Sequence, residues 1–150
     1  MSLSSLVASL WQQQENVAYR PPQVYNAATP VFNINGAVLI KLLGGFYTAA
    51  PGGATTLICA INGVNVCAAA VDIGTGGVIG EVWVSPLNVA GAMLGALGGL
   101  PFTDALLHSK GFLAGNSVGT IVCTFAVSTW TGSIFCIYKK LTPNAAITVA

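Results

Sequence analysis

The sequence predicts an all-β domain, and three observations support this prediction. The dipeptide Asn62-Gly63 separates two apolar runs, 55–61 and 64–71, and Asn-Gly is the strongest short-range signal for a β-hairpin. The runs 120–127 and 133–138 are dominated by β-branched and aromatic residues on either side of an expected turn at 129–132. The chain also contains 18 glycines and 7 prolines, which divide it into short segments. Many short strands separated by such turns indicate a single domain that is either a β-sandwich of the jelly-roll type or a β-barrel.

The rest of the chain from residue 31 onward has the same character. Further strands are expected at 31–43, 46–48, 78–85 and 147–149. Turns or bulges are expected at Asn33, Asn35 and Gly36, at Gly44-Gly45, at 51–53 and at 74–77. The segment 89–100 contains four glycines among small apolar residues and predicts neither a strand nor a helix.

Two segments have helical patterns. Residues 3–15 carry apolar side chains at the spacing of one helical face, with Ser2 as an N-cap. The members of this apolar stripe are Leu3, Leu6, Val7, Leu10 and Trp11. A short helix is expected over 103–110, with Thr103 as its cap and Gly111 as its end.

These patterns divide the chain into an amphipathic arm with a proline linker, 1–30, and a β domain, 31–150. Pro21-Pro22 forces an extended path, and Arg20 before it is excluded from the α region. Two interpretations of the arm stay open: a helix packed on its own domain, or an arm that docks on a neighbouring protein. In the second, the partner-binding residues are Leu3, Leu6, Val7, Leu10, Trp11, Arg20, Pro21 and Pro22.

The chain is very poor in charge, which bears directly on its function. Only nine of the 150 residues are Lys, Arg, Asp or Glu, and the mean hydropathy is +0.75. A lone globule of this mass exposes about 7,000 Å², hence about one charge per 800 Å², against about one per 200 Å² for average composition. We therefore expect much of the outer surface to be covered, by protein or by lipid. The net charge of +1, with no basic cluster beyond Lys139-Lys140, excludes an electrostatic footprint for nucleic acid.

A membrane span is the alternative way to cover this surface. Between Lys110 and Lys139 lie 28 uncharged residues, which exceeds the length needed to cross a bilayer as a helix. However, the stretch 111–138 is interrupted by glycines and by the turn at 129–132, and its apolar runs are strand-like. Two strands therefore explain it better than one helix, and we expect protein partners and no membrane.

No motif predicts catalysis, a cofactor or a metal. His108 is the only histidine, and it could share one helical face with Asp104. No serine or cysteine near this pair has a sequence context that marks it as an activated nucleophile. The four cysteines lack the C-x-x-C spacing of common zinc sites. The glycine-rich run 74–80 has isoleucine where a dinucleotide-binding loop needs its third glycine, and no helical pattern follows it. We expect a non-enzymatic protein without cofactor.

The four cysteines are expected to be reduced thiols that act as small buried hydrophobic side chains. The first residues lack the basic and apolar regions of a secretory signal. Counting from the hairpin turn puts Cys59 and Cys67 on opposite faces of the ribbon. Counting from the later turn makes Cys123 and Cys136 diagonal neighbours about 7–8 Å apart, too far for a comfortable disulfide.

Three blocks of sequence resemble small virion structural proteins of tailed bacteriophages. The blocks are VFNINGAVLI at 31–40, CAAAVDI at 67–73 followed by Gly80, and TGSIFCIY at 131–138 followed by Leu141-Thr142-Pro143. The resemblance covers about four-fifths of the chain and does not include residues 1–30 or 89–100.

The resemblance implies a capsid decoration or cement protein that is β-rich and homotrimeric. Its partners would be other copies of itself and the major capsid protein or another virion protein. It would lie on the phage head surface after assembly in the host bacterial cytoplasm. Two alternatives remain: a tail, head–tail joining or fibre-base component, and a small membrane protein with a span near 111–138.

Overall fold

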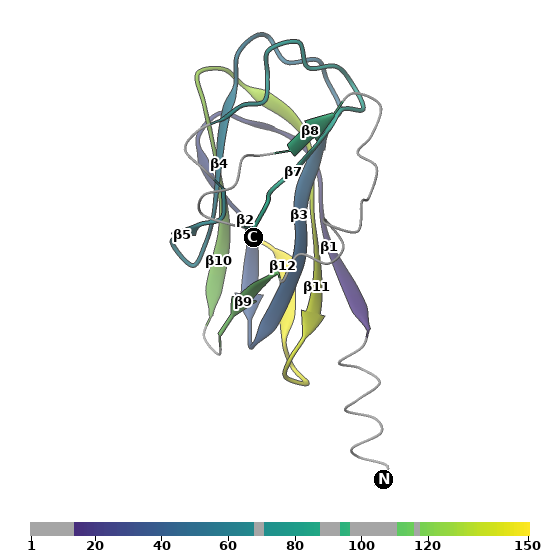
Figure 1. Ribbon diagram of the computed structural model, residues 1–150, viewed down its shortest axis with the longest axis vertical. Helices are drawn as coiled ribbons and strands as arrows, with labels where there is room; N and C mark the ends of the chain where they lie inside the picture. Colours follow the sequence, from purple (N-terminus) through teal and green to yellow (C-terminus); the bar gives the residue numbers. More distant parts are fainter. Residues whose placement is uncertain (1–13, 68–70, 88–93, 97–110, 116–117) are drawn as a thin grey trace, which may run out of the picture.

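Two antiparallel sheets pack face to face as a sandwich (Figure 1). The computed structural model describes residues 14–67, 71–87, 94–96, 111–115 and 118–150. Within these residues every regular element is a strand, so the all-β prediction is confirmed. The expected helix over 103–110 and nearly all of the expected helix over 3–15 lie outside the described residues.

In the described part of the chain, each sheet contains six strands. Sheet A has the order β1-β11-β3-β7-β8, with β9 also pairing with β3; sheet B has the order β12-β2-β10-β4-β5, with β6 also pairing with β4. The strands of sheet A are β1 (Glu15–Tyr25), β3 (Val38–Tyr47), β7 (Val82–Val84), β8 (Leu94–Ala96), β9 (Phe112–Ala114) and β11 (Trp130–Lys140). Those of sheet B are β2 (Ala28–Asn35), β4 (Thr56–Ile61), β5 (Val64–Asn65), β6 (Val71–Asp72), β10 (Gly119–Ala126) and β12 (Ala146–Val149).

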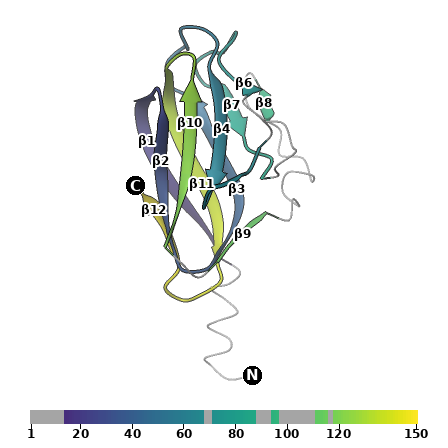
Figure 2. The same ribbon diagram turned by 90° about the vertical axis from the view of Figure 1, so that its left-hand side faces the viewer.

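Most successive long strands lie in different sheets; β4 and β10, which are both in sheet B, are the exception. The connections β1–β2, β2–β3, β3–β4, β10–β11 and β11–β12 each cross from one sheet to the other. Figure 2 shows sheet B toward the viewer, with β2, β10 and β4 in front of sheet A. The segments 120–127 and 133–138 were expected to pair as a hairpin, and this is wrong. β10 pairs with β2 and β4, whereas β11 pairs with β1 and β3, so the turn between β10 and β11 is a crossover.

The core lies between the sheets and follows from alternation along each strand. In β4 and β10, every second side chain is buried against the opposite sheet, and the others face outward. At one end of the core, the Trp130 ring stacks on Phe125 with a centroid distance of 4.9 Å. Tyr25 and Tyr47 contact the same indole at 5.3 and 5.6 Å, so residues from both sheets meet around one aromatic centre.

Glycines inside the strands of sheet A make room for the indole rings. A Cβ added at Gly132 would lie 2.4 Å from Trp130, and one at Gly45 would lie 2.7 Å from Trp83. Gly44-Gly45 was expected to end the strand, but β3 continues through both to Tyr47. These glycines permit close approach of bulky rings, a role that glycine also has within strands.

The Asn62-Gly63 hairpin is confirmed. Both residues have positive φ, 51° and 78°, as a type I′ turn requires, and Ile61 lies opposite Val64. The second strand is shorter than expected, because β5 ends at Asn65 instead of residue 71.

The sequence placed residues 15–25 in the arm and its linker, but the structure places them in a sheet. Residues 15–25 form β1, an edge strand of sheet A that pairs with β11 along most of its length. The register shifts between Arg20 and Gln23, so Pro21-Pro22 lies in a bulge instead of a free linker. A proline without an N–H is tolerated in such an edge bulge, which explains how β1 continues through the two prolines.

The segment proposed as an alternative membrane span, 111–138, contains β9, β10 and most of β11. Among the residues placed by the structure, no helix has the length and apolar character needed to cross a bilayer.

Candidate interaction surface

Charged side chains lie toward the two ends of the sandwich in the described part of the chain. Glu15 lies opposite Lys139 where β1 begins and β11 ends, and Lys41 and Lys140 are on the same side of the molecule. Asp72 and Glu81 lie near the other end, Asp72 at the end of β6 and Glu81 in the loop before β7. The Glu81 carbonyl accepts from the N–H of Tyr47 at the end of β3. In the described residues, the middle of each sheet therefore carries few charges: Arg20 lies at one edge, and Lys41 lies on β3 next to Leu42, the partner of Ile137 in β11.

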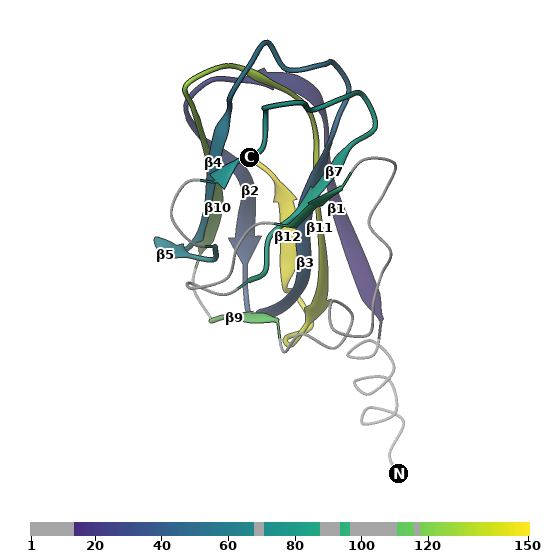
Figure 3. The same cartoon turned by 45° about the horizontal axis from the view of Figure 1, so that its top comes forward.

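Arg20 joins the two sheets at that edge. Its Nη1 donates to the carbonyl oxygens of Ala150 at 2.9 Å and Val31 at 3.1 Å. These bonds connect β1 of sheet A to β2 and to the residue after β12 in sheet B. Figure 3 shows the backbone of these three strands with the top of the sandwich turned forward. The structure thus gives Arg20 an intramolecular role that the sequence did not indicate, and its contact with a partner stays a prediction.

The outer face of sheet A is apolar. Val17, Tyr19 and Val24 project from β1 and are 65%, 46% and 63% exposed, which is high for side chains of this size. Half-buried side chains continue the same face across β11 and β3. We call this set the sheet A patch: Val17, Tyr19, Val24, Phe46, Phe135 and Ile137.

The sheet A patch is ordered by specific contacts. Tyr19 lies opposite Phe135 in the β1–β11 ladder and stacks near Phe46, with 6.5 Å between ring centroids and 17° between planes. The Tyr19 hydroxyl and the Ser133 hydroxyl are hydrogen-bonded at 3.0 Å. The ring is therefore held in position while nearly half of its surface stays exposed, as in the amphipathic aromatic side chains common in protein interfaces.

The outer face of sheet B is also uncharged but has different chemistry. Asn33 and Thr148 lie opposite one another on β2 and β12 and are both exposed. Threonines from β4 and β10 continue this face, among the half-buried side chains of Ile58 and Val122. Its polar groups are neutral, so they cost less to desolvate than charged groups would.

The glycine-rich run 74–80 is held by the carboxylate of Asp72. This side chain accepts hydrogen bonds from the backbone N–H groups of Thr55, Gly74 and Thr75 and from the Thr75 hydroxyl. The hydroxyl of Thr75 and the N–H of Gly74 are the main reasons why the pKa of Asp72 is lowered to about 2. The N–H groups that a phosphate loop would offer are thus used inside the chain.

All four cysteines are buried and unbridged, in agreement with the expected free thiols. Burial raises the pKa of Cys59, Cys67 and Cys136. Two predicted positions were wrong. Cys67 does not lie on the opposite face from Cys59: both are buried in the core, and Cys67 Sγ accepts from the Cys59 N–H at 3.4 Å. Cys136 is not a diagonal neighbour of Cys123, because the two lie in different sheets. The pair that meets is Cys59 and Cys123, with 3.4 Å between the sulfurs.

The predicted partner-binding residues are only partly placed. The apolar stripe of the arm lies outside the described residues; its members are Leu3, Leu6, Val7, Leu10 and Trp11. Pro21 and Pro22 are described and are exposed in the bulge of β1. Val17, Tyr19 and Val24 were missed. No strand pattern marks them in the sequence, because residues 15–19 read Glu-Asn-Val-Ala-Tyr and lack the alternation of apolar and polar side chains expected for a half-buried strand.

Comparison with known proteins identified no matching family model, no matching curated protein and no matching solved structure. Within the described ranges, no group of three or more His, Cys, Asp or Glu side chains could hold a metal ion.

Proposed function

We propose that this chain is a non-enzymatic virion structural protein that self-associates and coats the head of a tailed bacteriophage as a decoration or cement protein. The resemblance of 31–40, 67–73 and 131–138 to such proteins supports the proposal and implies a homotrimer. The alternatives are a tail, head–tail joining or fibre-base component of the same kind of particle.

The observation that carries the proposal is the exposure of the sheet A patch in a chain with so few charges. A protein that stays alone in water rarely exposes contiguous large apolar side chains without a binding role. Protein interfaces have an apolar core with aromatic residues and a polar rim. The sheet A patch, with charges toward the ends of the sandwich, has this arrangement, and we assign it to contact between copies of this chain.

The strand order adds weaker support. Long strands that mostly cross from one sheet to the other along the chain are arranged as in the jelly rolls that viral capsid proteins frequently use. A fold alone does not determine function, so the argument depends on the surface.

The mechanism would be stabilisation by mass action. A protein that binds only the assembled shell stabilises that shell by RT ln(1 + [L]/Kd). Copies that also bind one another would increase the effective concentration of each on the shell. Neutral outer faces suit this role, because they lose little hydration energy when covered.

Particles from the cells that produce this chain provide the direct test. Purified virions should contain the chain in many copies, and gold-labelled antibody against it should decorate the head surface in electron micrographs. Label confined to the tail would support the joining or fibre-base alternative. Particles that lack the chain would overturn the virion assignment.

The N-terminal arm needs a separate test, and the structure sets its boundary. Deletion of residues 1–13 leaves β1 intact, whereas a deletion to residue 22 would remove most of that strand. The shortened chain should keep its thermal unfolding transition but occupy fewer sites on particles. A control in which only Gln12 and Gln13 become alanine keeps the apolar stripe and should bind normally. Full occupancy by the shortened chain would show that the arm does not bind the shell.

A further inference from the structure

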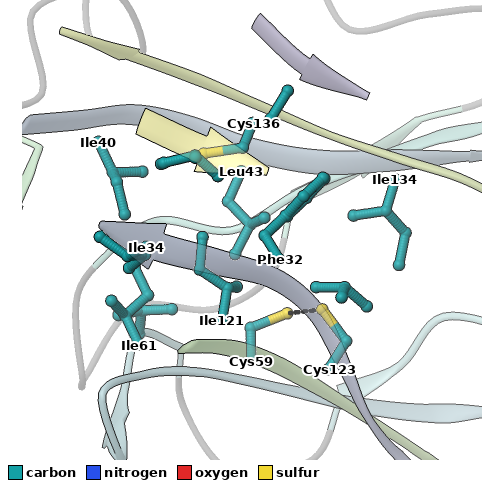
Figure 4. Close-up of a cluster of buried hydrophobic side chains, with 14 of the residues drawn as sticks. Phe32, Ile34, Ile40, Leu43, Cys59, Ile61, Ile121, Cys123, Ile134 and Cys136 are labelled. Carbon is teal, nitrogen blue, oxygen red and sulfur yellow. Dashed lines mark hydrogen bonds between the residues drawn. The ribbon is translucent and has the colours of Figure 1, made fainter. Parts of the chain in front are cut away.

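We propose that Cys59 and Cys123 form a latent disulfide site, which a small peroxide oxidant converts into a covalent bridge that stabilises sheet B. This inference does not depend on the proposed function. Figure 4 shows the two sulfur atoms facing one another from neighbouring strands inside the core. Cys136 lies apart from them in the same view.

The first argument is the distance. The two sulfurs are 3.4 Å apart, and both side chains are fully buried. A disulfide bond is about 2.05 Å long, so the sulfurs must approach by about 1.4 Å to bond. Small rotations of the two side chains could supply this movement without separating the strands.

The second argument is the register. Cys59 in β4 lies directly opposite Cys123 in β10. Cys59 uses its backbone N–H and C=O on the side away from β10, toward Cys67 Sγ and the N–H of Val66. The two cysteines are therefore a non-hydrogen-bonded pair, the kind whose Cα atoms approach to about 4.5 Å. That separation is within the range of disulfides.

A third sulfur lies beside the pair. Cys67 Sγ is held against the backbone N–H of Cys59 rather than against its sulfur. The site therefore has one favoured product, the bridge between Cys59 and Cys123, and one competing product, a bridge between Cys59 and Cys67.

The chemistry needs an oxidant, which we take to be hydrogen peroxide. The thiolate of one cysteine attacks an O–O oxygen, which gives a sulfenic acid and releases one water after proton transfer. The second thiol attacks that sulfur, the S–S bond forms, and a second water leaves. Two S–H bonds and one O–O bond are broken in total. Because burial raises the pKa of Cys59, the reaction should be slow near neutral pH and faster as the pH rises.

The bridge would join strands that are distant in the sequence, so it would restrict the unfolded chain strongly. The dithiol would persist in a reducing compartment, and the bridge would form only after the folded protein meets an oxidising one. For a virion protein, this would be after the particle leaves the cell.

The test uses the full-length folded protein. It is treated with dilute hydrogen peroxide without denaturant, and the remaining thiols are then blocked by alkylation in denaturant. Hydroxylamine cleavage at Asn62-Gly63 separates Cys59 from Cys67, and chymotrypsin cleavage after Phe125 and Trp130 separates Cys123 from Cys136. Mass spectrometry should identify the Cys59–Cys123 linkage as the main product. A main linkage from Cys59 to Cys67, or no linkage after prolonged exposure, would overturn the proposal.

Stability and matched variants give a second measurement. The bridged protein should unfold roughly 5–15 °C higher than the dithiol, and dithiothreitol should reverse the increase. Cys136→Ala removes a thiol from the same core and should keep both the linkage and the increase, whereas Cys123→Ala should lose both. A bridged protein that unfolds at the same or a lower temperature would overturn the stabilising role.

Discussion

The outer faces of the two sheets are both nearly free of charge, but they differ in chemistry. Sheet A exposes Val17, Tyr19 and Val24 beside half-buried aromatic rings, whereas sheet B exposes Asn33, Asn35 and Thr148. Covering the sheet A patch releases water from apolar surface, which is favourable without precise partners. Covering sheet B gains little unless each neutral polar group finds a hydrogen bond. Low charge alone therefore does not locate an interface, and the apolar side chains point to sheet A.

The largest expected effect is on the free energy of unfolding, and it concerns a side chain on the inner side of sheet A. Comparing it with a side chain on the outer side distinguishes residues needed for folding from residues needed for association. Trp130→Ala removes the ring that stacks on Phe125 and contacts Tyr25. It should lower the free energy of unfolding by about 3–5 kcal/mol, measured by denaturant titration. Tyr19→Ala, on the outer side of the same sheet, is the control and should change unfolding far less. Equal effects of the two changes would mean that Tyr19 belongs to the core rather than to an interface.

Charge placed on the two outer faces tests the comparison itself. Val17→Lys with Tyr19→Lys should weaken self-association about 10- to 100-fold, because the lysines must be desolvated in the apolar patch. Asn33→Lys with Asn35→Lys adds the same charge at the same spacing on sheet B and should weaken it much less. Analytical ultracentrifugation measures both. A larger effect of the sheet B pair would reverse the assignment of the two faces.

Arg20→Ala should have a smaller effect, on the edge where the sheets meet. Loss of the guanidinium leaves the carbonyls of Val31 and Ala150 without this donor. The free energy of unfolding should fall by about 1–3 kcal/mol, and backbone amides of β12 should exchange with solvent faster. Arg20→Lys, which keeps the charge but not the forked geometry, should recover only part of the loss. Unchanged exchange in β12 would contradict a clamp at this edge.

The smallest expected effect is pH-dependent and lies at Asp72. The pKa of this carboxyl is lowered in the folded state from 3.8 to about 2, so its ionised form stabilises the fold above the unfolded pKa. This stabilisation should be lost as the pH falls from about 4 to about 2. In thermal unfolding across this range, Asp72→Asn should show a weaker dependence on pH than the wild type. The same slope in both proteins would show that the hydrogen bonds of Asp72 do not contribute.

Local signals in the sequence predicted much of the fold. The Asn62-Gly63 turn, the turn at Gly36 and the strand near 147–149 depend on neighbouring residues, and the structure contains all three. The continuation of β3 through Gly44-Gly45 could not be predicted in the same way. It depends on the ring of Trp83, about forty residues away, which occupies the space that a Cβ would need.

Pairing between distant segments explains the other differences. The sequence of β10 and β11 is typical of a hairpin, but the two strands lie in different sheets. β10 pairs with strands of sheet B, and β11 pairs with strands of sheet A. The same cause hid the Cys59–Cys123 pair, whose members are brought together only by the β4–β10 ladder. The sheet A patch was missed for a related reason: β1 becomes a strand because β11 pairs with it, despite Pro21-Pro22.

Sedimentation equilibrium of the wild-type protein over a wide concentration range tests the central claim most directly. If the sheet A patch is an interface between copies of this chain, the mean mass should rise with concentration from the 15.2 kDa of one copy toward a defined oligomer. A constant mass of 15.2 kDa up to high concentration would contradict the account.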